Sequence, residues 1–208
     1  MNKLIKYLTL AAAVAGLTGM AYAYPVYGWG EIQLTSGATT ITIQDNQAGD
    51  ANSALGQIVA VGLSLNGWTL TITAGETKPF LGSSARPEMD LGVQGGGGNG
   101  PLTIKFSDLY FGPTNGALKS TATENGTSVE TSAVYMDAGD AIFALTTLLY
   151  SGSVINDASS YSLTLVDTFT PGTISADHRI TVPDGGTTAL LLGLGLLGMG
   201  LIRRSRKS

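Results

Sequence analysis

The sequence predicts an all-β protein: a single antiparallel β-sandwich of the jelly-roll-like kind, with a targeting segment at each end. Short runs in which apolar residues alternate with polar ones are typical of strands that bury one face. Asn-Gly pairs at 66–67, 115–116 and 125–126 interrupt these runs and favour tight turns, because both residues tolerate positive φ. We find no repeat of fixed period, which favours a sandwich over a repeat array.

The strongest hairpin signal covers residues 59–73, where two alternating runs flank Asn66-Gly67. A two-residue turn fixes the register and places every apolar partner on one face, so we expect Trp68 to lie in the core. The predicted pairs are Leu65 with Trp68, Leu63 with Leu70, and Val61 with Ile72.

Other segments are less uniform. The nearly all-apolar stretch 141–150 is compatible with a buried strand or a short helix, since periodicity does not separate the two. We interpret Gly95–Gly98 as a flexible loop, because a phosphate-binding loop would open a helix and carry a lysine before Ser or Thr. Further strands are predicted at 40–44, 102–106, 128–136, 161–169 and 174–181.

Residues 1–23 have the organisation of a secretory signal peptide. Lys3 and Lys6 precede an apolar stretch, and Ala21 and Ala23 form the small-x-small pattern at which such peptides are cleaved. Cleavage would leave Tyr24 at the mature N-terminus, whereas an uncleaved N-terminal anchor is the alternative. The 158 residues at 24–181 have the size of one domain, which we expect to be the sandwich.

The last 27 residues, 182–208, have three parts: a short Pro-containing motif (182–186), an uncharged apolar stretch (187–202) and a basic end (203–208). As a helix, the sixteen apolar residues span roughly 24 Å, slightly less than a ~30 Å hydrocarbon core. We expect a transmembrane helix whose basic end stays in the cytoplasm, so that residues 24–181 are exported. The motif residues are Val182, Pro183, Asp184, Gly185 and Gly186, and the basic residues are Arg203, Arg204, Arg206 and Lys207.

This three-part tail resembles the PEP-CTERM class of bacterial sorting signals, most closely its VPDSG-CTERM variant. Four motif positions match, and Gly185 stands where the variant has Ser. The resemblance implies recognition by a membrane-embedded exosortase, removal of the tail, and transfer to the cell surface or extracellular matrix. The alternatives are a plain C-terminal membrane anchor that is never cut, and a buried soluble helix.

Composition excludes several function classes. The chain has no cysteine, so disulfides, thiolate metal sites and cysteine nucleophiles are absent. Of its 11 basic and 15 acidic residues, five and fourteen lie within 24–181, a net charge of about −9 there. Such a surface repels nucleic acid.

The titratable residues give weak signals for chemistry. His178, the only histidine, lies beside Asp177 a few residues before the motif, and we expect it on a juxtamembrane stalk that is a poor scaffold for a catalytic triad. One histidine without cysteine also excludes the common zinc sites. Glu88 and Asp90 share a strand face near Arg86, but a glycosidase needs two carboxylates across a cleft, which this spacing does not imply.

Two acidic turns could contribute oxygen ligands to calcium, Asp45 with Asp50 and Asp137 with Asp140. Neither matches the twelve-residue calcium-loop pattern, so solvated turns are the alternative and no other cofactor is expected. Tyr24, Tyr27 and Trp29 could stack on sugars, or could pack an N-terminal strand.

The sequence therefore predicts a non-enzymatic exported bacterial surface or matrix protein. Its partners would be an exosortase and, before processing, the membrane. The alternative is an exported carbohydrate-binding module that contacts exopolysaccharide, and a carboxylate-based hydrolase is a third hypothesis.

Overall fold

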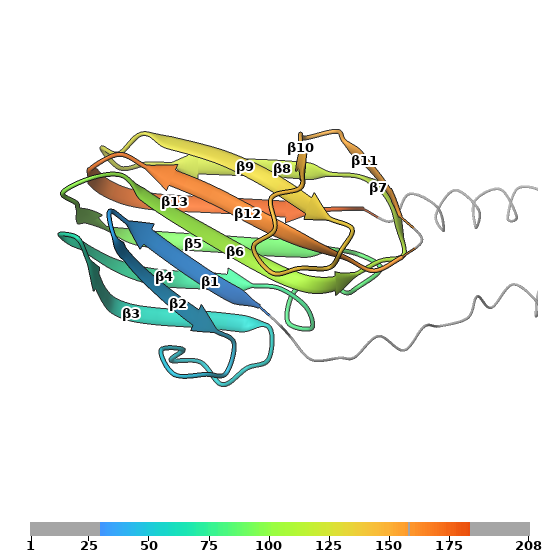
Figure 1. Ribbon diagram of the computed structural model, residues 1–208, viewed down its shortest axis with the longest axis horizontal. Helices are drawn as coiled ribbons and strands as arrows, with labels where there is room; N and C mark the ends of the chain where they lie inside the picture. The colour runs from blue at the N-terminus through green and yellow to red at the C-terminus, as the bar shows by residue number, and fades with distance from the viewer. Residues whose placement is uncertain (1–29, 158, 184–208) are drawn as a thin grey trace, which may run out of the picture.

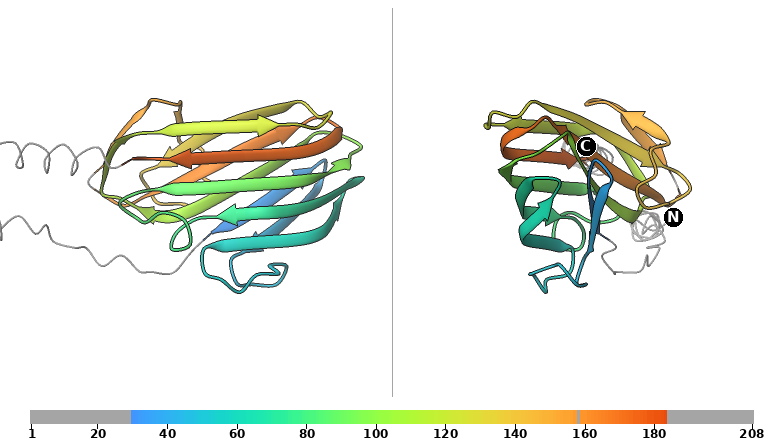
Figure 2. Two further views of the ribbon diagram at one scale, coloured as in Figure 1. Left: turned by 180° about the vertical axis from the view of Figure 1, so that it is seen from behind. Right: turned by 60° about the vertical axis from the view of Figure 1, so that its left-hand side comes forward.

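The computed structural model describes residues 30–157 and 159–183, which form two antiparallel β-sheets packed face to face (Figure 1). The six-stranded sheet has the order β10-β9-β12-β6-β1-β2, and the five-stranded sheet has the order β3-β4-β5-β13-β8. The left view of Figure 2, turned by 180° from Figure 1, has the five-stranded sheet in front. Strand β11 pairs with β7 in a separate two-stranded ribbon. The predicted all-β antiparallel sandwich is confirmed, and its jelly-roll-like character stays a prediction.

The described residues contain thirteen strands, and each of the five further predicted strand segments overlaps one of them. The bounds are β1 (Glu31–Ser36), β2 (Thr39–Gln44), β3 (Gln57–Leu65), β4 (Trp68–Glu76), β5 (Glu88–Gly97), β6 (Leu102–Phe111), β7 (Thr114–Ala117), β8 (Lys119–Glu124), β9 (Glu130–Asp137), β10 (Thr147–Leu149), β11 (Val154–Asp157), β12 (Tyr161–Phe169) and β13 (Gly172–Thr181).

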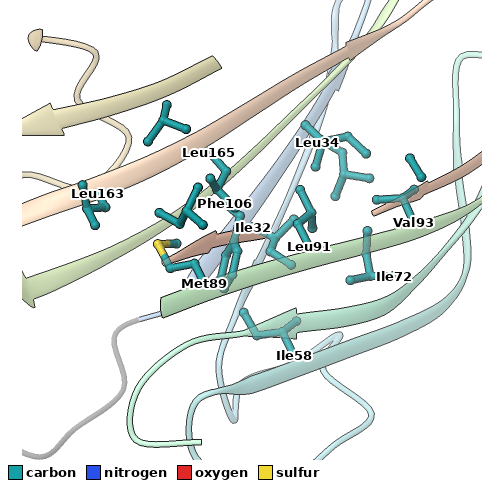
Figure 3. Close-up of a cluster of buried hydrophobic side chains, with 14 of the residues drawn as sticks. Ile32, Leu34, Ile58, Ile72, Met89, Leu91, Val93, Phe106, Leu163 and Leu165 are labelled. Atoms are coloured by element: carbon teal, nitrogen blue, oxygen red, sulfur yellow. The ribbon is translucent and has the colours of Figure 1, made fainter. Parts of the chain in front are cut away.

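The core fills the space between the sheets, because alternate residues of most strands point inward (Figure 3). Large aliphatic and aromatic side chains from both sheets interdigitate there, which is how a sandwich excludes water. Labelled members are Ile32, Leu34, Phe106, Leu163 and Leu165 from one sheet, and Ile58, Ile72, Met89, Leu91 and Val93 from the other.

The predicted hairpin forms, with one correction. Leu65 pairs with Trp68 and Leu63 with Leu70, but Ile72 pairs with Ala60 rather than with Val61. The register shifts between Ala60 and Leu63, around Gly62 at φ 71°. Such a bulge adds a residue to one strand and turns the following side chains over, which leaves Val61 72% exposed.

The interpretation of the glycine run as a flexible loop is wrong. Gly95 to Gly97 are the end of β5, paired with β4 on one side and β13 on the other. A Cβ at Gly95 would lie 2.2 Å from the Thr69 carbonyl oxygen, and one at Gly98 would lie 2.3 Å from the Trp68 ring. The glycines are therefore required by the close approach of neighbouring chain.

Neither reading of 141–150 is correct. Only Thr147–Leu149 form a strand, the short edge strand β10, and Leu145 and Leu148 are exposed. Among the described residues, the structure contains no helix that is long and apolar enough to cross a membrane. The predicted signal peptide (1–23) and the tail from 184 onward lie outside those residues, and the boundaries of the three predicted regions stay predictions.

Candidate functional site

His178 does not lie on a stalk, contrary to the sequence-based expectation. It belongs to β13, where its side chain is fully buried between the sheets. Its Nδ1 atom lies 2.6 Å from Oδ1 of Asp167, and its Nε2 atom lies 3.0 Å from Oγ of Ser120. Asp167 is on β12 in the opposite sheet and Ser120 is on β8, so these three residues, here called the histidine bridge, connect both sheets.

The position of His178 follows from strand alternation. Ile174, Ala176 and Ile180 of β13 point inward, and His178 occupies the inward position between Ala176 and Ile180. This period-two pattern is visible in the sequence and could have predicted a core position for His178. Its partner Ser120 gives no such signal, because β8 (KSTATE) has no apolar alternation.

The order of atoms in the histidine bridge is that of a Ser-His-Asp catalytic triad. In such an enzyme the imidazole passes a proton to the leaving group, so the substrate must reach Nε2. His178 is 0% exposed and Asp167 is 1% exposed, and a substrate cannot contact them in this conformation. What the geometry does provide is a partner for each ring nitrogen, as buried polar groups require.

A second carboxyl lies close to the bridge. Burial raises the pKa of the Glu130 carboxyl on β9 to about 7, and the nearby Asp167 carboxylate adds to the rise. The Ser132 hydroxyl donates a hydrogen bond of 2.8 Å to Glu130 Oε1, which partly offsets the shift. Among the described residues, no group of three or more His, Asp or Glu side chains is arranged to hold a metal ion.

The raised pKa of Glu130 predicts a specific pH dependence of stability. The folded state binds the Glu130 proton more tightly than the unfolded state does, so protonation of this carboxyl stabilises the fold. The stabilisation is complete below the ordinary pKa of 4.5 and is lost as pH rises to about 7. We expect Glu130→Gln, which imitates the protonated form, to have a higher Tm than the wild type at pH 8 and nearly the same Tm at pH 5. Calorimetry at both pH values checks this, and an equal difference at both would contradict it.

The candidate hydrolase carboxylates lie on the outer face of the sandwich. Glu88 and Asp90 are both on β5, and Glu88 is 3.4 Å from Arg179 and 3.9 Å from Arg86. Burial and the adjacent carboxyl of Asp177 on β13 raise the pKa of Asp90 to about 7. The predicted shared face is therefore correct, but the two carboxylates stand side by side on one strand rather than across a cleft.

In the first acidic turn, the carboxylates of Asp45 and Asp50 accept hydrogen bonds from backbone N–H groups of the surrounding loop. Asp50 accepts hydrogen bonds from the backbone N–H groups of Asn46, Asn52 and Val59 at 2.9–3.0 Å, and Asp45 accepts one from Gly56 at 2.7 Å. These bonds engage oxygens that a calcium ion would need.

The second acidic turn is built in the same way. Asp137 accepts hydrogen bonds from the Thr146 hydroxyl and, with a smaller effect, from the Ala141 N–H, and both lower its pKa. Asp140 accepts a hydrogen bond from the Tyr110 N–H at 2.8 Å. Calcium binding at either turn stays a prediction.

Two residues of the C-terminal motif are described, and both lie against the domain. Val182 is 1% exposed, and its N–H donates a 2.9 Å hydrogen bond to the carbonyl of Pro87. Pro183 follows it at the surface. The other motif residues, Asp184, Gly185 and Gly186, and the basic residues Arg203, Arg204, Arg206 and Lys207 lie outside the described residues.

A family model described as the VPDSG-CTERM motif matches residues 181–206. The chain ends in a VPDSG-CTERM sorting motif. This match agrees with the resemblance seen in the tail and accommodates Gly185 in the position of Ser. The motif supports a C-terminal sorting signal on an exported protein and covers about an eighth of the chain. A search of curated proteins finds no match.

Neither the family match nor the structure of the sandwich tests the prediction that N-terminal aromatic residues stack on sugars. Tyr24, Tyr27 and Trp29 lie outside the described residues, as do the predicted cleavage residues Ala21 and Ala23. Trp68, the other tryptophan, is fully buried and donates its indole N–H to the Gly100 carbonyl at 3.0 Å, which makes it a core residue as predicted.

Proposed function

We propose that this protein is a non-enzymatic surface or extracellular-matrix protein of bacteria, whose β-sandwich is exported and then released from the membrane by an exosortase. The observation that carries the proposal is the VPDSG-CTERM match at 181–206, which begins at the last residue of the last strand. The predicted apolar helix at 187–202 would hold the precursor in the membrane with its basic end in the cytoplasm. In that arrangement Pro183 lies at the outer interface, within reach of a membrane enzyme.

Two features support a non-enzymatic role for the sandwich. The only histidine is sealed in the core, where it connects the sheets instead of facing a substrate. The candidate carboxylates Glu88 and Asp90 lie on one strand beside arginines, which does not build the facing pair that glycoside hydrolysis needs.

The proposal predicts that Pro183→Ala blocks processing and leaves membrane insertion intact. The motif loses its proline while the apolar helix and basic end are unchanged, so full-length protein should accumulate in the membrane fraction. Fractionation and intact mass in cells that express an exosortase measure this. As a control, replacing the four basic residues Arg203, Arg204, Arg206 and Lys207 with Glu should remove the orientation bias and mislocalise the precursor. Normal release of the Pro183→Ala protein would contradict the proposal.

Exopolysaccharide binding is the alternative role for the exported domain. It would use the aromatic rings of Tyr24, Tyr27 and Trp29, which could stack on sugars. Retention of the exported protein on a polysaccharide column, lost on Trp29→Ala, would favour this alternative over a protein without a carbohydrate ligand.

A further inference from the structure

The sorting motif begins inside the folded domain. Thr181, the first matched residue, is the last residue of β13 and pairs with Glu88 of β5 and with Lys119 of β8. Val182 extends the inward series of that strand by one more position, since Ile180 points inward two residues earlier. Its side chain is part of the core. Val182 is therefore both a core residue of the sandwich and the first residue of the Pro-containing motif 182–186.

The β7–β11 ribbon covers this residue from the other side. It lies beside the end of β13 (Figure 1). A Cβ on Gly116 of β7 would lie 2.3 Å from the Pro183 carbonyl oxygen and 2.9 Å from Cγ1 of Val182. Gly116 pairs with Ile155 of β11, which is itself buried. Val182 and Pro183 thus lie between Pro87, the residue before β5, and the backbone of the ribbon.

We propose that the folded sandwich occludes the start of its own sorting motif, so that the tail is cut from the minor population in which Val182 has left the core. This inference rests on the proposed function. An enzyme that binds the motif in extended form needs the Val182 backbone and side chain, and both are engaged by the domain. Release requires opening of the end of β13 only, a local event that leaves the rest of the sandwich folded. The stability of this end of the domain then sets the rate of tail removal.

Gly116→Ala tests the proposal without altering the motif. The φ of Gly116 is not positive, so alanine can adopt this backbone conformation, but its methyl group would displace Pro183. We expect the Val182 amide of the full-length variant, purified from cells without exosortase, to exchange hydrogen about tenfold faster than in the wild type. In cells with exosortase, the tail should be lost several-fold faster. Gly100→Ala is the matched control, because its φ is also not positive and the nearest atom, Nδ2 of Asn66, lies 3.7 Å from the new methyl group.

The outcomes separate this inference from the function on which it rests. Faster exchange and faster tail loss in Gly116→Ala, with Gly100→Ala like the wild type, supports it. Faster exchange with unchanged tail loss overturns the occlusion alone. Retention of the tail in every variant despite exosortase overturns the proposed function, and the inference with it. If Gly116→Ala does not fold, the wild type still decides: a Val182 amide that exchanges as fast as a free peptide overturns the docking.

Discussion

Asp167→Ala should lower the free energy of unfolding by about 3 kcal/mol, because it removes one partner of a buried polar pair and leaves the other unsatisfied. Asp167 is 1% exposed and lies 2.6 Å from Nδ1 of His178, which has no exposed surface. Since the two residues belong to opposite sheets, the loss acts where the layers meet. Urea unfolding followed by circular dichroism measures the change.

The control for this variant is Thr168→Ala on the same strand. Thr168 is only partly buried, and its hydroxyl contacts that of Thr103 on the neighbouring strand β6. Loss of this hydroxyl should lower the free energy of unfolding by less than about 1 kcal/mol. If Asp167→Ala proves as mild as the control, the histidine bridge does not hold the sheets together. Labelling of Ser120 by a fluorophosphonate would also contradict the structural interpretation, since it would show an accessible and activated nucleophile.

Trp68→Ala should destabilise the domain by roughly 3–5 kcal/mol. The ring is fully buried, packs against the backbone of Gly98 and donates a hydrogen bond to Gly100. Truncation would therefore leave a large cavity and an unpaired carbonyl. Trp68→Phe keeps most of the volume and should cost less, which separates packing from the hydrogen bond. Equilibrium unfolding of the wild type and both variants measures these free energies. If Trp68→Ala leaves the free energy of unfolding unchanged, the ring does not lie in the core.

Local pattern was enough to predict the sandwich and most strands. The 59–73 hairpin is encoded by its turn and its alternation, both of which are short-range features. The bulge around Gly62 was not predicted, because a glycine inside a strand does not reveal whether the register shifts there. The strand role of Gly95 was also missed, since its need for a bare backbone arises from β4, more than twenty residues earlier in the chain.

The two candidate sites differed in how far the sequence could identify them. The sorting tail is contiguous, so its motif, apolar stretch and basic end could be interpreted together without a fold. The histidine bridge joins β8, β12 and β13, and Ser120 lies 58 residues from His178. Such a site exists only once the sheets have assembled. The burial of Val182 was also out of reach, because it depends on the β7–β11 ribbon packing over the end of β13.

The most direct test of the proposed sorting is the intact mass of the wild-type protein recovered from the cell surface, with sequencing of its C-terminal peptide. If an exosortase processes the tail, the mature protein ends near Val182, Pro183 or Asp184 and lacks the apolar stretch and the basic end. Residues 190–208 still attached to the surface protein would contradict processing and would reduce the tail to a membrane anchor.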